Sequence, residues 1–440
     1  MLNTVSTLRD FIRKLVATPL RKAVTTVLLT LFSSFVITRL IVARITDGIT
    51  GPASYTVWVV GDFENTRKHR SIRDGFRPRE SLKAKIDGRA VTVEERADTG
   101  DPKAIRDIAM RLAERRDTLL VVGHMRSTAT KEALAVYLNQ VPPIPVILTT
   151  ETNPDLAPPH RPGDPNYPLV RLSATDRAQA RDAVVFALAK GKRSFWVVED
   201  TFNPVYSHYL AVEFIRNVQQ AHREGNGQVS VWSTNLTPPS VETIRKTEVD
   251  CVLFAGLWSN ALITIRQMKA IGGPANSRPI FVLSDASAEQ DLILRRSKDS
   301  AEEAVVREEV GEDVYVMQPA NAKQFEPQGH GLYGKDARLM VETLVSKAAA
   351  EFDAYRRGHH PLDHVFKRVL DIHRVYDARQ VLHHVIDRDL FRMDAVEGGE
   401  KDTRLDLGYT YPSSDEYSIS NTKFRVWQVK GKRFEDAKAP

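Results

Sequence analysis

Short, β-branched apolar runs alternate with helical patterns along most of this sequence. The first four runs are YTVWVVG, AVTVEER, TLLVVG and IPVILTT, at residues 55–61, 90–96, 118–123 and 144–150. Helical patterns separate the second, third and fourth runs. Because parallel strands need long crossover connections, which are usually helices, this alternation predicts βαβ units in a parallel sheet covered on both faces.

The alternation stops at residues 153–168, which contain six prolines, and then resumes. Four further apolar runs lie at residues 194–200, 228–234, 251–256 and 279–284. These patterns predict an α/β fold of two Rossmann-like, doubly wound lobes around a cleft, with a hinge where the chain crosses between them. The expected lobes are residues 54–171 with 318–404, and residues 172–317 with 405–434.

A long apolar stretch near the N-terminus has the length of a membrane span. Residues 23–43 contain one charge, Arg39, close to the far end, and five basic residues precede them. By the positive-inside rule we expect residues 1–22 to be cytoplasmic, residues 23–43 to form a transmembrane signal anchor, and the rest to be extracytoplasmic. A cleaved signal peptide and a soluble amphipathic helix are the alternatives.

Charge and motif content argue against several other functions. The net charge is +6, but the first 50 residues, with seven basic and two acidic side chains, supply +5 of it. No basic block remains to suggest nucleic acid as a partner. The chain has no phosphate-loop or His-Glu-x-x-His motif, so we expect no cofactor and no enzyme activity. Six histidines between residues 359 and 384 leave metal binding open, with a structural reading favoured and no metal expected.

Open parallel sheets bind ligands at the carboxyl ends of their strands. At these ends the first half places two hydroxyl clusters, which suit a carboxylate together with free helix N–H groups. The second half places aromatic residues and one carboxylate there, which suit an ammonium group. The candidates are Ser127, Thr128, Thr130, Thr149, Thr150 and Thr152 from the first half, and Tyr206, Trp258 and Asp285 from the second. Helix capping by Ser127 is the alternative to ligand binding.

These residues occur in an ordered series that resembles a known family. The stretches VVGHMRSTAT, PVILTTETNPDL, WVVEDTFNPVYSHYLA and DCVLFAGLWSNALITIRQMKAIGG are similar to segments of type I periplasmic binding proteins of ABC transporters. The similarity is greatest to those that bind leucine, isoleucine and valine, and it extends from about residue 54 to residue 434.

The resemblance implies a role for each candidate residue. Ser127, with Thr128 beside it, would hold a ligand carboxylate. Thr152 would bind carboxylate and ammonium, helped by the carbonyl near Thr150. Tyr206 and Asp285 would contact the ligand from the second lobe, and Leu257 or Trp258 would line the side-chain pocket.

Two departures from the family bear on the ligand. The loop before Tyr206 is about two residues longer than usual, and Arg126 and Glu151 add charges beside the hydroxyl loops.

We therefore expect a solute-binding protein that captures an amino acid or a similar small carboxylate by hinge closure. Its expected partners are the ligand, the membrane and ABC permease subunits. A membrane-tethered sensor, an enzyme on the same fold and a structural protein with a degenerate cleft are the alternatives.

Overall fold

The computed structural model describes the chain from residue 52 with gaps, together with Thr30 and Ser34. The described ranges are 52–64, 66–78, 80–156, 169–201, 203–225, 230–235, 248–270, 279–288, 292–296, 304–307, 310–319, 330–357, 374–389, 424–431 and 433–437. The expected anchor at 23–43, apart from Thr30 and Ser34, and most of the Pro-rich segment lie outside these ranges. Within them, no helix combines the length and the apolar character that a bilayer crossing requires.

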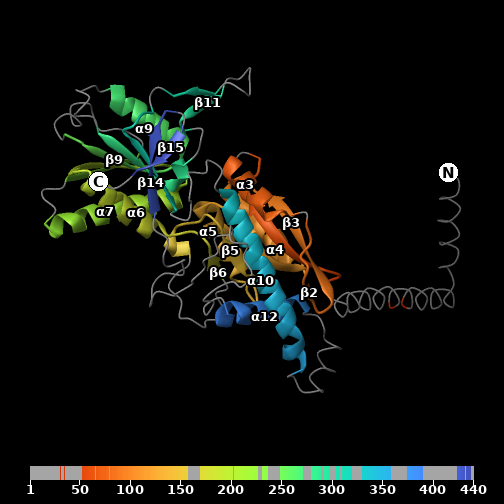
Figure 1. The fold of residues 1–440 in the computed structure, drawn as a ribbon. Helices are drawn as coiled ribbons and strands as arrows, with labels where there is room; N and C mark the ends of the chain where they lie inside the picture. Colours follow the sequence, from red (N-terminus) through yellow and green to blue (C-terminus); the bar gives the residue numbers. More distant parts are fainter. Residues whose placement is uncertain are drawn as a thin grey trace, which may run out of the picture.

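The first lobe is built on a six-stranded sheet with the order β2-β3-β1-β4-β5-β6 (Figure 1). All neighbours in it are parallel except β2 and β3. Its strands are β1 (Tyr55–Gly61), β2 (Lys85–Ile86), β3 (Arg89–Ala97), β4 (Thr118–Gly123), β5 (Val146–Leu148) and β6 (Leu169–Arg171). The predicted βαβ alternation therefore forms a parallel sheet.

Helices cover both faces of this sheet, which explains why its central strands are apolar without alternation. In β1, Val57 and Val59 face one core, whereas Trp58 and Val60 face the other. The first core is closed by α3 (Arg67–Phe76), α10 (His330–Arg357) and α12 (Arg374–Asp389). The second core is closed by α4 (Pro102–Glu114) and α5 (Ser127–Tyr137).

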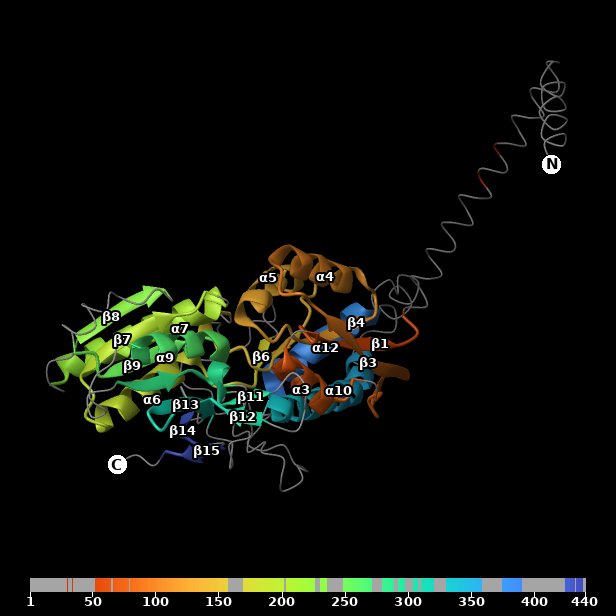
Figure 2. The same ribbon diagram turned by 90° about the horizontal axis from the view of Figure 1, so that it is seen from above.

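Helix α10 returns to the first lobe late in the chain and packs against α3, as both views show (Figures 1 and 2). Gly334 makes this close approach possible, because a Cβ atom at this position would collide with the carbonyl oxygen of Ile72. The glycine thus allows helices about 260 residues apart in sequence to share one core.

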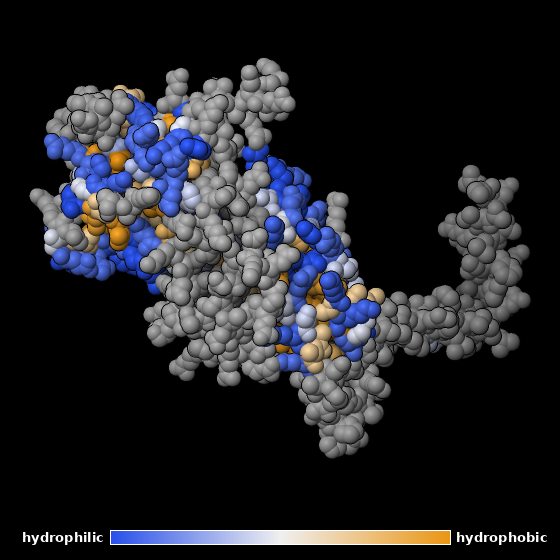
Figure 3. Space-filling view, in the orientation of Figure 1, coloured by the Kyte–Doolittle hydropathy of each residue, from blue (hydrophilic) through white to orange (hydrophobic). Residues whose placement is uncertain are grey.

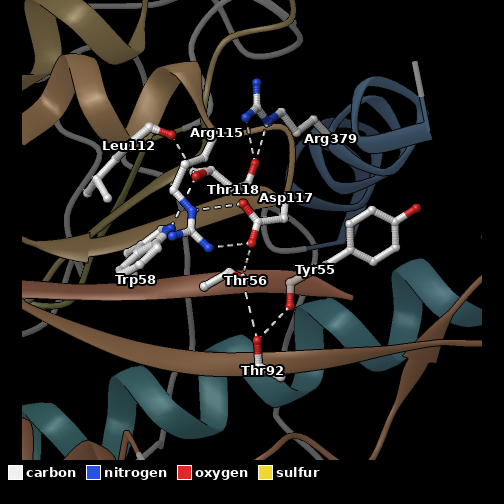
Figure 4. Close-up of polar contacts among 9 residues, drawn as sticks. All are labelled: Tyr55, Thr56, Trp58, Thr92, Leu112, Arg115, Asp117, Thr118 and Arg379. Carbon is white, nitrogen blue, oxygen red and sulfur yellow. Dashed lines mark hydrogen bonds and ion pairs between the residues drawn. The ribbon is translucent and has the colours of Figure 1, made fainter. Parts of the chain in front are cut away.

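A polar cluster at the amino ends of the first-lobe strands attaches α12 to the sheet (Figure 4). Arg379 of α12 is buried, and its Nε and Nη2 donate to the Thr118 carbonyl at 2.8 and 2.5 Å. Beside it, Arg115 stacks on Trp58 and pairs with Asp117 through two hydrogen bonds of 2.9 and 2.7 Å. Because ligand sites in such sheets lie at the opposite edge, this cluster is structural.

The second lobe contains a seven-stranded sheet with the order β15-β14-β13-β10-β9-β7-β8. The strands β13, β10, β9, β7 and β8 are parallel, and β14 and β15 add antiparallel strands at one edge. The bounds are β7 (Ser194–Glu199), β8 (Ser230–Asn235), β9 (Cys251–Ala255), β10 (Ile280–Leu283), β13 (Val314–Pro319), β14 (Phe424–Lys430) and β15 (Arg433–Asp436).

The second sheet is also covered on both faces. Helices α6 (Asp176–Ala189) and α7 (Pro204–Arg223) pack on one face, and α9 (Trp258–Ala270) packs on the other. Two short helical turns, η1 (Pro154–Leu156) and η3 (Asp285–Ser287), follow β5 and β10, and β11 (Leu294–Arg296) pairs with β12 (Ala304–Val306). The α/β fold with two parallel-sheet lobes is thereby confirmed.

The two lobes lie side by side, and the chain crosses from β6 into α6 between them (Figure 2). The predicted segment boundary between residues 317 and 318 falls inside β13, because Gln318 and Pro319 still pair with β14. In the view of Figure 3, hydrophilic residues make up most of the described surface of both lobes. This distribution agrees with helices whose apolar faces are packed on the sheets.

Candidate ligand-binding site

A cleft of about 770 Å³ opens between the lobes, where the loops after the parallel strands meet. From the first lobe it is lined by Asp62, Lys68, Met125, Arg126, Ser127 and Thr150, among others. From the second lobe it is lined by Asn203, Tyr206, Leu257, Trp258, Asn260 and Asp285. Five of the nine candidates that the sequence offered therefore reach one cavity, namely Ser127, Thr150, Tyr206, Trp258 and Asp285.

Ser127 lies at the start of α5 and faces the cleft. The strand β4 ends at Gly123, whose φ of +111° and close approach to the Val60 carbonyl leave no room for a side chain. Arg126 then occupies the N-cap position, where no side chain caps the helix. The Ser127 side chain is 2% exposed, and its hydroxyl makes no hydrogen bond to a described residue. Ser127 is therefore not the cap, and its hydroxyl is available to a ligand.

Thr128 is not among the residues that line the cleft, and it joins the lobes. Its hydroxyl donates to Asn203 Oδ1 at 2.7 Å, and the Val205 amide donates to the same hydroxyl at 3.3 Å. Both partners lie at the start of α7 in the second lobe. Thr128 is consequently an interlobe contact, although its sequence neighbour Ser127 lines the cavity.

Glu151 is turned into the first lobe and organises both hydroxyl loops. Its buried carboxylate accepts hydrogen bonds from the amides of Met125, Thr149 and Thr150 at 2.9, 2.7 and 2.8 Å. The Thr130 hydroxyl adds a fourth at 3.0 Å. The Glu151 carboxylate, which the sequence placed beside the ligand, therefore accepts hydrogen bonds from the protein itself, and Thr130 and Thr149 are among the donors.

Thr150 and Thr152 occupy different environments. Thr150 lines the cleft, and its hydroxyl donates to the Met125 carbonyl at 3.2 Å. Thr152 is buried outside the cleft lining, and its hydroxyl has no hydrogen-bond partner among the described residues. Its carbonyl accepts from the Asp176 amide at 2.9 Å, across the crossing between the lobes.

Tyr206 and Asp285 form the second-lobe side of the site. The Tyr206 hydroxyl donates to Asp285 Oδ1 at 2.7 Å, and it lies 3.3 Å from Gln179 Oε1. Tyr206 and Asp285 are 4% and 7% exposed, and both line the cleft. The longer loop before Tyr206 has therefore not removed it from the cavity, because α7 begins at Pro204 and carries Tyr206 in its first turn.

Asp176 is an acidic residue of this region that the sequence analysis missed. It is fully buried at the start of α6, and neither of its carboxylate oxygens accepts a hydrogen bond from a described residue. Burial raises the pKa of Asp176 well above its usual range. The charges of Asp285 and Glu213 add to this rise, whereas interactions with the Thr152 hydroxyl and the Arg171 guanidinium oppose it. In the sequence, only its position directly after the crossing between the lobes could have drawn attention to it.

Asp200 holds the loop that presents Trp258. Its carboxylate accepts from the Leu257 amide and from Asn260 Nδ2, both at 2.8 Å. Trp258 begins α9, and the Arg307 guanidinium lies 5.8 Å from the centre of its ring. The buried Asp200 carboxylate therefore fixes the loop from which Trp258 lines the cavity.

The histidines and the cysteine give no metal centre in the described part of the chain. No group of three His, Cys, Asp or Glu side chains there is placed to hold a metal ion. His383 is buried, and its Nε2 lies 2.9 Å from the Pro143 carbonyl oxygen. His359, His360, His364 and His373 lie outside the described ranges. Cys251 is buried in β9, where burial raises the pKa of its thiol.

The fold and the interlobe cleft define a bilobed α/β binding protein. The chain belongs to the periplasmic binding protein family, because the model of that family matches residues 70–325. This match confirms the family that the sequence resembles. No curated protein sequence matches the chain significantly.

Solved structures show the same fold. A leucine-binding protein from Thermotoga maritima has a TM-score of 0.58 at 15% identity, covering 87% of this chain and 98% of that one. An ABC transporter substrate-binding protein from Desulfitobacterium hafniense in complex with leucine has a TM-score of 0.54 at 14% identity, covering 87% and 100%. A solute-binding protein from Rhodopseudomonas palustris in complex with benzoate has a TM-score of 0.53 at 13% identity, covering 87% and 95%.

Proposed function

We propose that this protein is an extracytoplasmic solute-binding protein that captures an amino acid by hinge closure and delivers it to an ABC-type importer. The observation that carries the proposal is Asp285, which lines the cleft beside Tyr206 and lies near the buried carboxyl group of Asp176. Two neighbouring buried carboxylates are unfavourable unless one takes up a proton or a cation pairs with them. An ammonium group entering the cleft at Asp285 supplies that cation.

The opposite wall suits the other end of an amino acid. Ser127 offers an unused hydroxyl, and the first turn of α5 adds the partial positive charge of a helix N-terminus, although its Thr128 amide already donates to Asn203 Oδ1. A carboxylate therefore binds on the first lobe and an ammonium group on the second. A ligand with both groups bridges the lobes, which favours the closed arrangement.

Titration calorimetry on the full chain tests the proposal. We expect L-amino acids to bind, and benzoate and 4-methylpentanoate, which lack the amine, not to bind. Asp285→Asn should weaken amino acid binding by about 30-fold or more, because it removes one charge of a buried pair. Asp155→Asn, at an exposed position of the first lobe, is the control. Equal binding of benzoate that is insensitive to Asp285→Asn would contradict the amino acid assignment.

We also propose that residues 23–43 anchor the protein in the membrane as a single-pass segment. The support is the long apolar stretch behind five basic residues. Carbonate washing of membranes from cells that express the full chain should leave the protein in the pellet. Release of a protein whose N-terminus follows residue 43 would indicate a cleaved signal peptide instead.

A further inference from the structure

The first-lobe wall of the cleft is strongly cationic. Among the described lining residues, Arg67, Lys68, Arg70 and Arg126 carry positive charge, against the carboxylates of Asp62 and Asp285. All four cations belong to the first lobe, whereas Asp285 belongs to the second. The cleft is therefore polarised, and its positive wall carries more charge than one ligand carboxylate requires.

Two helices start at this wall, and the Asp62 carboxylate that lies beside the start of α3 is paired with Arg126. The N-cap residues Thr66 of α3 and Arg126 of α5 make no side-chain capping hydrogen bond. The first turn of each helix contains no acidic residue. Because helix N-termini carry partial positive charge, each of them favours an anion. Ser127, which is buried and faces the cleft, lies at the start of α5.

The cations differ in how far the protein already uses them. Arg126 Nη2 donates to Asp62 Oδ2 at 2.7 Å and to Thr66 Oγ1 at 2.6 Å, so its charge is largely balanced. Arg70 Nη1 donates to the carbonyls of Phe63 and Glu64, which leaves its charge uncompensated by these contacts.

Lys68 is a cation of this wall whose charge no described residue pairs with. It is partly buried in the first turn of α3, and it forms no ion pair or hydrogen bond with a described residue. The electrostatic potential around Lys68 is positive, because Arg67, Arg70 and Arg126 line the same wall. Burial lowers the pKa of neighbouring His69, and the charges of Arg126 and Lys68 lower it further, so the imidazole is neutral at pH 7.

We propose that the ligand is an amino acid whose side chain carries a second anionic group, and that Lys68 and the first turn of α3 bind this group. The proposal rests on the proposed function: the start of α5 holds the α-carboxylate, and Asp285 holds the ammonium group. A second carboxylate and a phosphate share the required chemistry, so both are tested below.

Calorimetric titration of the full chain at low ionic strength compares matched pairs of ligands. The pairs are L-glutamate with L-glutamine, L-aspartate with L-asparagine, and O-phospho-L-serine with L-serine. We expect the acidic member of at least one pair to bind about 10-fold or more tighter than its neutral partner. The pair with the largest ratio identifies carboxylate or phosphate as the distal group. Added salt should reduce that ratio, because the attraction is partly exposed to solvent.

The variant Lys68→Gln should reduce the acidic-to-neutral ratio by about 5-fold or more while leaving binding of the neutral amino acid nearly unchanged. Lys103→Gln removes the same charge from an exposed site on α4 outside the cleft, and it should leave the ratio unchanged. An equal effect of both substitutions would overturn the assignment to Lys68.

The remaining outcomes separate this inference from the function on which it rests. If L-leucine or the neutral members bind as tightly as the acidic ones, the inference is overturned and the proposed function stands. If no amino acid binds, the proposed function fails and the inference fails with it.

Discussion

At the residue scale, neighbouring hydroxyls in this site have different tasks. Ser127 faces the cleft, Thr128 joins the lobes and Thr130 binds the buried Glu151 carboxylate. These three residues are among the first four of α5, so the direction in which each side chain points decides its role. Substitutions at Ser127 and Thr130 should therefore separate binding from stability.

Ser127→Ala should weaken amino acid binding by about 10- to 150-fold, the equivalent of a hydrogen bond to a charged group worth about 1.5–3 kcal/mol. The melting temperature of the free protein should stay the same, because the hydroxyl has no internal partner. Thr130→Ala should instead lower the free energy of unfolding by about 1–3 kcal/mol, because one donor to buried Glu151 is lost. Denaturant unfolding and calorimetry measure both effects. Unchanged affinity in Ser127→Ala would exclude a role in carboxylate binding.

Asp176 gives the free protein a specific pH dependence. Its raised pKa means that the folded state binds a proton more tightly than the unfolded state, where the carboxyl pKa is about 3.9. The contribution of this group is therefore fully present at low pH and is lost as pH rises towards the folded-state pKa. Urea unfolding at a series of pH values should show this loss in the wild type, and Asp176→Asn should remove it.

The same residue predicts how binding changes with pH. An ammonium ligand favours the ionised form of Asp176, so affinity should rise with pH until Asp176 is fully deprotonated in the free protein. The Asp176→Asn variant should bind with a flatter profile over that window. Affinity that falls with rising pH in the wild type would contradict a role for this carboxylate in attracting the ligand.

At the scale of elements, late segments of the chain complete the first lobe. Helix α12 is fixed to β4 by Arg379, whose two donors meet the Thr118 carbonyl (Figure 4). Burial lowers the pKa of Arg379 to about 10, so the guanidinium remains protonated at neutral pH. The helix is therefore held by a charge-assisted contact at the end of the sheet opposite to the cleft.

Arg379→Met should lower the free energy of unfolding by about 1.5–3 kcal/mol, because the buried Thr118 carbonyl loses charged donors. Ligand affinity should not change, since the cluster lies away from the cleft. Arg115→Met in the same cluster is the matched control, because the Arg115 side chain is 45% exposed and its ion pair with Asp117 should contribute less than about 1 kcal/mol. Chemical denaturation measures both variants. An equal loss of unfolding free energy in the two variants would contradict the prediction that Arg379 stabilises the protein more than Arg115 does.

At the scale of the whole molecule, the lobes are joined by polar contacts next to the cleft. Besides Thr128 and Asn203, Asn153 Nδ2 donates to the Val205 carbonyl at 2.7 Å. Within the first lobe, buried Arg171, just before the crossing, donates to the carbonyls of Thr152 and Asn153 and so positions the loop that carries Asn153. The Thr128–Asn203 and Asn153–Val205 contacts join the lobes next to the cleft, whereas Ser127 and Asp285 line it from opposite lobes.

Ligand binding should reduce the radius of gyration measured by small-angle X-ray scattering, because the two ends of the ligand bind opposite lobes. Asn203→Ala should weaken amino acid binding by about 5-fold, which corresponds to one interlobe hydrogen bond of about 1 kcal/mol. Asn217→Ala, further along α7, is the control for this helix. An unchanged radius alongside measurable binding would contradict hinge closure.

The sequence by itself determined the alternation of strands and helices between residues 55 and 284, the two α/β lobes and the family. Apolar periodicity is a local property, so strands such as 55–61 and 118–123 are visible without tertiary information. The strand ends also predicted Ser127, Tyr206, Trp258 and Asp285 at the cleft, because parallel strands bring their carboxyl ends to one edge.

Only the tertiary structure decided which polar side chains remain available to a ligand. Glu151 turned inward because three backbone amides and a hydroxyl converge on it, and Thr128 turned towards Asn203, 75 residues away. Asp176 and Asp285, more than 100 residues apart, became neighbours only when α6 and β10 packed in one lobe. Pairing and burial of charges depend on such distant contacts, whereas sequence periodicity reports only the local chain.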